Sequence, residues 1–306
     1  MAIVNFGSIN IDKVFTVDSI VVPKETIHSR RVDTFTGGKG ANQSVAVAKS
    51  GYKEIYHAGL IGSDGSWIID KLSSYKVDTR FIETIKDHLT GQAMIQVDSS
   101  GQNAIVLYGG ANHSFTHSYV DTVLDHFDKG SWVLLQNEIN LNDYILKQSY
   151  VRGLNVVLNP APYDSTITDL SLEYLSVLAL NEVEAEGLSG LSDPLKALEK
   201  LCSDYPKTAI LITVGPHGVL YGKGRTTRYS YGTWDVPVVD TTAAGDTFIG
   251  YLVSSLAQGL SVEEALHLSS AASNLTIMTH GAMDSIPTIG ELSRINEYTK
   301  KEFSLP

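Results

Sequence analysis

The chain has 306 residues, of which 43% are hydrophobic and 19% are charged, and its formal net charge is −11. This composition is that of a folded globular protein and excludes extensive disorder. The acidic balance argues against binding to nucleic acid or an anionic membrane, and the single cysteine, Cys202, excludes an internal disulfide and a cysteine-ligated metal. The N-terminal segment lacks the features of a secretory leader, and no apolar run is long enough for a membrane span, so we expect a cytoplasmic protein.

The N-terminal third of the chain predicts one core strand, one helix and a separate group of β-strands. The apolar run Ile3–Phe6 is typical of a buried strand. Residues 13–35 are β-rich and irregular, whereas small and apolar residues recur at helical spacing between Gly37 and Gly51. Residues 92–108 hold two β-type runs around a glycine-containing turn, which predicts a hairpin.

From residue 116 onward, helical and strand-like patterns alternate. Such alternation predicts a mostly parallel sheet with helices on both faces. We expect one three-layer α/β/α domain over residues 1–306, with a small β-sheet lid from about 13–35 and 92–108. The expected helices are 116–128, 141–151, 193–204, 244–258, 262–278 and 289–301, and the expected strands are 132–136, 155–159, 177–180 and 209–214.

Polar or glycine-containing clusters follow several of these strand-like runs. Because ligands of such sheets bind beyond the carboxyl ends of the strands, we expect the clusters to contribute to one site. They are Gly7–Asp12, Asn137–Glu138, Asn159–Pro162, Asn181–Glu184, Val214–Gly218 and Asp240–Asp246.

The strongest local motif is D-T-T-A-A-G-D-T-F at Asp240–Phe248, which follows the strand-like run W-D-V-P-V-V and opens a helix. Free amides at a helix start form an anion site that suits a transferring phosphoryl group. Asp246 is placed there to accept the proton of an attacking hydroxyl. An equally supported interpretation is structural, with Thr241 or Thr242 as the helix cap and Asp246 complementing the dipole. The amides that would form the anion site belong to Ala243, Ala244, Gly245 and Asp246.

A second motif, G-G-K-G-A-N, opens the helix after Gly37. Its glycines suit close approach to a polar ligand, but the spacing matches neither a Walker A loop nor a dinucleotide fingerprint. Asn10 and Asp12 alternate along an extended segment, so both face one side. Together with Lys39 they would bind hydroxyl groups, although a turn with a solvated lysine and an Asx turn are the structural alternatives.

Asn181 and Glu184 lie on one face of an expected helix start, where they would hold the water shell of Mg²⁺. The same spacing is that of a capping box, which local evidence favours. His113 and His117 have i,i+4 spacing without a third ligand, so we do not expect zinc.

Together these residues resemble the ribokinase branch of the PfkB carbohydrate kinase family. The resemblance extends from Gly7 to about Pro287 and is carried by the two glycine motifs in the expected order. It is supported between them by N-P-A-P at 159–162, N-E-V-E-A-E at 181–186 and L-I-T-V-G-P-H-G at 211–218. The family commonly has glycine where this chain has Lys24, and often histidine where it has Ser270.

The resemblance implies a ribokinase-like fold and a role for each matching position. Asp246 would be the catalytic base, with Ala243, Ala244 and Gly245 as the anion hole. The sugar-binding positions would be Asn10, Asp12, Gly38, Lys39, Asn42, Glu138 and Asp246, under the apolar lid positions Ala93, Ile95 and Leu107. The nucleotide side would contain Asn181, Thr213, Gly215, Gly218 and Gly245, with Glu184 toward Mg²⁺ and Asp240, Thr242, Gly281 and Ser285 toward K⁺.

The activity implied is transfer of the ATP γ-phosphate to the 5-hydroxyl of D-ribose, assisted by Mg²⁺ and K⁺. A deoxyribokinase or another carbohydrate or nucleoside kinase of the family is the alternative. A catalytically silent sugar-binding regulator on the same fold is a further alternative, against which the intact Asp246 and Lys39 argue. An exposed strand edge in the lid predicts pairing with a second copy of the chain.

Overall fold

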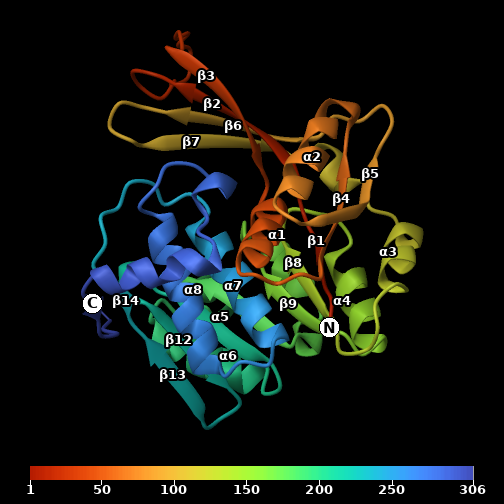
Figure 1. The fold of residues 1–306 in the computed structure, drawn as a ribbon, viewed down its shortest axis with the longest axis vertical. Coiled ribbons are helices and arrows are strands. Elements are labelled where there is room, and N and C mark those ends of the chain that lie inside the picture. The colour runs from red at the N-terminus through yellow and green to blue at the C-terminus, as the bar shows by residue number, and fades with distance from the viewer. Residues whose placement is uncertain (306) are drawn as a thin grey trace.

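The structure, a computed structural model, describes residues 1–305. Within them, the main sheet has the strand order β13-β12-β11-β10-β9-β8-β1-β4-β5 (Figure 1). The strands from β5 to β11 are parallel, and β12 and β13 are antiparallel at the edge. The bounds are β1 Ile3–Phe6, β4 Ile55–Ile61, β5 Asp78–Thr84, β8 Trp132–Gln136, β9 Asn155–Asn159, β10 Val177–Asn181, β11 Ala209–Thr213, β12 Val219–Lys223 and β13 Thr227–Tyr231.

Helices pack on both faces of this sheet, which confirms the predicted three-layer α/β/α architecture. One face is covered by α1 Lys39–Lys49, α2 Ser66–Ser74, α7 Ala244–Ala257 and α8 Val262–Thr276. The other face is covered by α3 His117–Leu124, α4 Asn142–Val151, α5 Glu182–Ser189 and α6 Pro194–Asp204.

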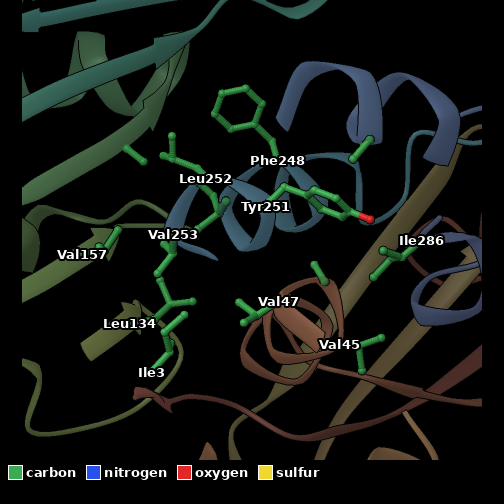
Figure 2. Packing of buried hydrophobic residues seen from close by; sticks show 14 of the residues in the cluster. Ile3, Val45, Val47, Leu134, Val157, Phe248, Tyr251, Leu252, Val253 and Ile286 are labelled. Carbon is green, nitrogen blue, oxygen red and sulfur yellow. The ribbon is translucent and has the colours of Figure 1, made fainter. Parts of the chain in front are cut away.

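Alternate residues of each strand pack into two separate hydrophobic cores, one on each face of the sheet. Ile3 and Leu134 point toward α7, where they meet Val253 (Figure 2), whereas Val4 and Leu135 point to the opposite face. This period of two follows from the pleat of the strands. Burying each such side chain stabilises the fold by about 1.5–3 kcal/mol, so both layers are fixed to the sheet.

The lid is a separate sheet with the order β3-β2-β6-β7, which projects from the body (Figure 1). Its strands are β2 Asn10–Thr16, β3 Arg31–Gly37, β6 Gly91–Val97 and β7 Asn103–Tyr108. These are the two segments from which the sequence predicted a lid. Apolar side chains on both faces are exposed, including Phe35 and Leu107 on one and Met94 and Val106 on the other.

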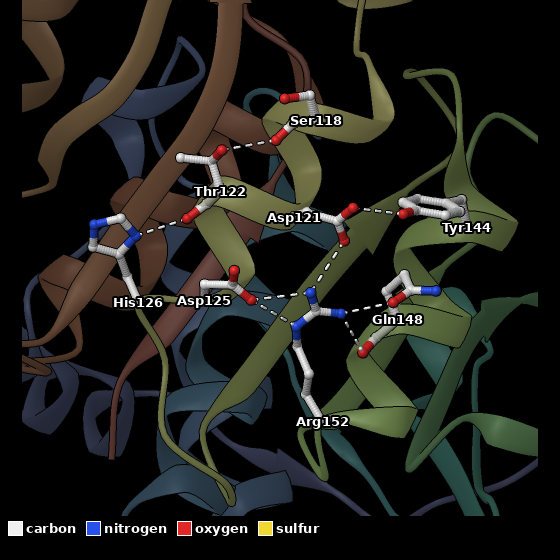
Figure 3. Close-up of polar contacts among 8 residues, drawn as sticks. All are labelled: Ser118, Asp121, Thr122, Asp125, His126, Tyr144, Gln148 and Arg152. Atoms are coloured by element: carbon white, nitrogen blue, oxygen red, sulfur yellow. Dashed lines mark hydrogen bonds and ion pairs between the residues drawn. The ribbon is translucent and has the colours of Figure 1, made fainter.

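An arginine joins α3 to α4, which lie on the face of the sheet opposite α7. Figure 3 shows its contacts. The Arg152 guanidinium donates to Asp121 Oδ1 at 3.1 Å, to Asp125 Oδ1 at 3.0 Å and to Gln148 Oε1 at 2.7 Å. Ion pairs near the surface contribute about 0–1 kcal/mol each, so this cluster fixes how the helices lie more than it stabilises them.

The C-terminal segment differs from the sequence expectation of one helix over 289–301. A 3-10 helix spans Ile289–Glu297, and β15 Lys300–Lys301 then pairs with β14 Thr233–Trp234. The strand-like run before the late motif is therefore paired at Trp234 and continues as irregular chain. A partner distant in sequence decides this pairing, which local periodicity does not reveal. No helix among residues 1–305 has the length and apolar character needed to cross a membrane.

Candidate active site

The candidate site lies where the strand order of the main sheet reverses. From β1 the chain proceeds to β4 and β5 on one side and to β8–β11 on the other. Ligands of open α/β sheets bind at such a switch point, beyond the carboxyl ends of the strands. The loops there touch, because Ser8 Oγ donates to Glu138 Oε2 and Lys39 N donates to the same oxygen at 3.1 Å.

A cavity of about 1220 Å³ opens at this edge, between the lid and the body. It brings together most of the positions that the sequence singled out, from both ends of the chain. Ala244, Gly215, Gly218 and Ser285 lie outside its lining. The predicted positions that line it are Asn10, Asp12, Gly38, Lys39, Asn42, Ala93, Ile95, Leu107, Glu138, Asn181, Glu184, Thr213, Asp240, Thr242, Ala243, Gly245, Asp246 and Gly281.

Asp246 lies in the first turn of α7 and is buried, and α1 orients its carboxylate. Asn42 Nδ2 donates to Oδ2 at 2.9 Å, and Gln43 Nε2 donates to Oδ1 at 3.0 Å. These two amide donors hold both carboxylate oxygens of Asp246 in place at the cavity wall.

The start of α7 presents backbone amides to the cavity. Its N-cap is Ala243, which has a left-handed φ of 60° and no side-chain cap bond, so the interpretation of Thr241 or Thr242 as the cap is wrong. Ala244 N donates to Thr241 O at 3.3 Å. Within residues 1–305, the amides of Ala243, Gly245 and Asp246 have no acceptor. Unpaired amides at a helix N-terminus attract an anion.

Asn10 has its amide orientation fixed by a neighbour that the sequence did not single out. Asn112 Oδ1 accepts from Ile9 N at 3.0 Å, so its Nδ2 is the group that donates to Asn10 Oδ1 at 2.8 Å. The Asn10 carbonyl oxygen is thereby occupied and its NH₂ group remains for a ligand. A Cβ on Gly91 would come within 2.2 Å of both amides, so glycine is required beneath them.

Acidic groups crowd the end of the cavity that contains Asn10, Asn42 and Asp246, which is called the acceptor end below. Burial, and then the charges of Glu138 and Asp246, raise the pKa of Asp12 to about 7. Burial also raises the pKa of Glu138, although the hydrogen bond from Ser8 and the charge of Lys39 oppose it. The pKa of Lys39 is raised, chiefly by Asp246, so this lysine stays protonated between the carboxylates. Among residues 1–305, Asp12 Oδ1 and Asn42 Oδ1 are buried without a hydrogen-bond partner.

The lid places apolar side chains over these polar groups. Asp12, Ala93 and Leu107 are register neighbours across β2, β6 and β7, so all three face the same side. Ile95 follows two residues after Ala93 and also lines the cavity. Ala93 is buried, whereas Leu107 is half exposed, so the outer part of the lid face is open.

The opposite end of the cavity, called the nucleotide end below, is formed by the start of α5 and the end of β11, next to the loop that contains Gly218. Asn181 and Glu184 form the capping box of α5, with Glu184 N donating to Asn181 Oδ1 at 2.9 Å. Glu184 still lines the cavity, and burial raises its pKa. Thr213 ends β11 and donates to Leu180 O at 3.2 Å. Gly218 has a φ of 111°, and a Cβ there would lie 2.1 Å from Tyr231 O.

The residues expected to hold a monovalent cation also meet. Asp240 Oδ1 accepts from Thr242 N at 2.9 Å, and its Oδ2 accepts from Gly281 N at 3.0 Å. Partial burial acts to raise the pKa of Asp240, but the hydrogen bonds from Gly281 and Thr242 have a larger opposite effect. The pKa of Asp240 is therefore lowered overall. Ser285 Oγ donates to the carbonyls of Gly281 and Ala282, both at 2.7 Å. No three His, Cys, Asp or Glu side chains among residues 1–305 gather as a metal site.

Sequence reasoning missed residues that hold the site in place. Gln43, Gln136 and Asn112 are buried amides that contact site residues or one another. Gln43 directly follows the early glycine motif, and a glutamine among small and apolar helix residues was a usable signal. Asn112 and Gln136 carried no local signal.

Comparisons with known proteins identify the family of the chain. The model of the pfkB family carbohydrate kinases matches residues 2–289. The chain is 34% identical to the ribokinase of Staphylococcus aureus (strain COL) over 303 residues, which cover 96% of this chain and 99% of that one. It is 35% identical to the Haemophilus influenzae ribokinase over 300 residues, which cover 95% of this chain and 97% of that one. The solved Arabidopsis thaliana ribokinase complexed with ribose and ATP has a TM-score of 0.87 at 27% identity and covers 98% of this chain and 100% of that one. This chain belongs to the pfkB family of carbohydrate kinases.

Proposed function

We propose that the protein is an ATP-dependent ribokinase that transfers the γ-phosphate of ATP to the 5-hydroxyl of D-ribose. The observation that carries this proposal is the buried Asp246 carboxylate beside the amides of Ala243 and Gly245, all lining one cavity. Phosphoryl transfer depends on positioning and charge stabilisation, which a base beside an anion site supplies. The ribokinase relatives support the choice of acceptor.

The acceptor end has the chemistry of a polyhydroxyl site. Asp12 Oδ1 and Asn42 Oδ1 are unsatisfied acceptors within residues 1–305, and the Asn10 NH₂ group and Lys39 are donors. A sugar hydroxyl both donates and accepts, so each of these groups finds a partner when sugar binds. The apolar lid residues Ala93 and Ile95 would exclude water, which competes as phosphoryl acceptor.

The nucleotide end suits ATP with Mg²⁺. The γ-phosphate would meet the α7 amides, and the loop of Thr213, Gly215 and Gly218 would adjoin the nucleotide. Mg²⁺ keeps much of its water shell and is held by few carboxylates together with phosphates. Glu184, which lines the cavity, would suit such water-mediated contact, and the ion would neutralise phosphate charge.

We assign the K⁺ site to the segment of Asp240 and Thr242 and the loop of Gly281 and Ser285. Both segments bring oxygen donors together next to the α7 amides, and hard cations prefer oxygen. An ion there would set the position of the segment that precedes Ala243. Ala243 itself has the strained φ of 60°, which a rigid surrounding must maintain.

We also propose that residues 1–306 act as one domain and pair as a homodimer through the lid, in the cytoplasm. The support is the set of exposed apolar side chains on the lid, such as Met94, Val106 and Tyr108. Contiguous exposed apolar surface marks interaction sites. Molecular mass by light scattering, compared with that of Val106→Asp, tests this: a monomeric wild-type chain would refute it.

A sugar panel with ATP consumption as readout tests the function. D-Ribose, 2-deoxyribose, fructose and adenosine would be compared with and without KCl, and with and without MgCl₂. We expect the highest kcat/KM for ribose and a loss well over ~10-fold for deoxyribose, because a missing hydroxyl leaves buried polar groups unpaired. Equal use of deoxyribose or adenosine would refute the ribose assignment, and no turnover of any acceptor would refute the kinase.

A further inference from the structure

Four buried amide and carboxylate side chains form one line of hydrogen bonds that ends at Asp246. Asn5 Oδ1 accepts from Gln136 Nε2 at 3.0 Å, and Gln136 Nε2 also donates to Gln43 Oε1 at 2.8 Å. Gln43 Nε2 then donates to Asp246 Oδ1 at 3.0 Å. The line runs from β1 and β8 through α1 to α7, so it crosses the layers of the fold.

The direction of this line is fixed at its far end. Asn5 Nδ2 donates to Gly40 O at 2.7 Å, and a backbone carbonyl can only accept. Asn5 therefore turns its oxygen to Gln136, and Gln136 in turn donates to the oxygen of Gln43. Gln43 is left with its NH₂ group facing Asp246. If the Gln43 amide were flipped, its Oε1 would face Asp246 Oδ1, and two hydrogen-bond acceptors would oppose each other. The orientation of Gln43 is therefore set before any substrate binds.

The two oxygens of Asp246 have different surroundings. Oδ1 is bonded to Gln43, which is fully buried and lies outside the cavity lining. Oδ2 is bonded to Asn42, which lines the cavity. On this basis an acceptor hydroxyl that approaches from the cavity is expected at Oδ2.

We propose that Gln43 is a positioning residue that anchors Asp246 through Oδ1 and leaves Oδ2 as the oxygen that receives the hydroxyl proton. This inference rests on the proposed kinase function and adds a residue and an atom to it. During transfer the hydroxyl O–H bond breaks, its proton passes to Oδ2, and its oxygen forms the bond to the γ-phosphorus as the bond to ADP breaks.

The remaining neighbours do not provide the same anchor. Lys39, Asp12 and Glu138 face Asp246 across the cavity and act through their charge. At the other end of the network, Ser44 Oγ joins Asn5 to His57. Burial lowers the pKa of His57 to about 4, so this end is neutral at physiological pH. Asp246 is the only ionisable side chain of the four in this line, because Asn5, Gln136 and Gln43 are neutral amides.

Gln43→Met tests the proposal, because it keeps the length of the side chain and removes the donor. We expect kcat to fall ~10–100-fold, the usual consequence of losing one hydrogen bond to a charged group, while KM for the sugar changes by less than ~3-fold. Gln136→Met leaves Gln43 in place but frees its amide to turn, and we expect a smaller fall in kcat in the same direction. Unchanged kcat in both variants, or an effect on KM alone, would overturn the proposal.

A double-mutant cycle separates positioning from a general loss of structure. If Gln43 acts through Asp246, Gln43→Met added to Asp246→Asn lowers kcat little further, whereas independent effects multiply. Ser149→Ala, at a buried hydroxyl in α4, is the control for packing and should leave kcat unchanged. If Gln43→Met does not fold, the same double-mutant cycle is measured with Gln136→Met and Asp246→Asn, and its result tests the proposal. Wild-type turnover in the same assay tests the kinase function, and the variant-to-wild-type ratio tests Gln43.

Discussion

The two ends of the cavity are built in different ways. At the acceptor end, Asn10, Asn42 and Asp246 are 6%, 7% and 7% exposed, and another side chain holds each one. At the nucleotide end, Thr242 and Gly245 are exposed, and unpaired amides at the start of α7 lie in the cavity wall together with the buried side chain of Glu184. One end is mainly a set of oriented side chains, and the other is mainly a set of backbone amides.

This difference predicts which end of the cavity tolerates side-chain substitutions and which does not. A buried side chain that loses its partner pays the full cost of an unsatisfied polar group. A contact between a ligand and the backbone persists when most side chains are changed, and it discriminates less between ligands. Substitutions at the acceptor end should therefore be far more damaging than substitutions at the nucleotide end.

The largest effect is expected at the carboxylate between the two ends. Asp246→Asn removes the proton acceptor and keeps the shape, so kcat should fall ~10²–10⁴-fold while sugar binding is retained. Steady-state kinetics and calorimetric titration of the sugar measure the two quantities. Asp235→Asn, at an exposed carboxylate paired with Lys301, is the control and should have wild-type activity. Retention of full activity by Asp246→Asn would show that another group is the base.

The next effect concerns the amide pair at the base of the lid. Asn112→Ala frees the Asn10 amide to turn its oxygen to the cavity, so we expect KM for ribose to rise ~10-fold with a smaller change in kcat. Adding Asn10→Ala should then cost little more, because both act on one contact. Asn296→Ala, at an exposed position of the 3-10 helix Ile289–Glu297 and outside the cavity lining, is the matched control. Additive losses in the double variant would show that Asn112 does not act through Asn10.

Burial of Asp12, together with the charges of Glu138 and Asp246, predicts a stability cost at the acceptor end. The pKa of Asp12 is raised to about 7 in the folded state, so its contribution to stability is full below pH ~4 and is lost as pH rises to 7. Asp12→Asn does not titrate, so its melting temperature should gain on wild type by ~2–4 °C or more between pH 5 and pH 8. Sugar binding should weaken in the same variant. A melting-temperature difference that is constant across this range would contradict the raised pKa.

The smallest effect is expected at the nucleotide end. Thr213→Val removes a hydroxyl that donates to Leu180 O and leaves the backbone in place, so KM for ATP should change by less than ~3-fold. Initial rates over a range of ATP concentrations measure it. A loss as large as that of Asn112→Ala would end the distinction between the two ends of the cavity.

Part of this site followed from local pattern. The glycine motifs at helix starts and the alternation of Asn10 and Asp12 singled out Asn10, Asp12, Lys39 and Asp246, which line one cavity, whereas the lid and loop positions came from the family resemblance. The capping box of Asn181 and Glu184 was also visible, because it needs four consecutive residues. The missed contacts join residues far apart, since Gln43 and Asp246 are separated by 203 positions. The orientation of an amide depends on such partners, which no local period records.

The sequence by itself determined the layers, the strand ends and the two glycine motifs, because these depend on periods of two and of about 3.6 residues and on turn chemistry. Tertiary structure decided which amide bonds each oxygen of Asp246, which way Asn10 turns, and that Lys300–Lys301 pairs as β15 with β14. Each of these is settled by hydrogen bonds between segments that meet once the sheet has formed, so each required the complete fold.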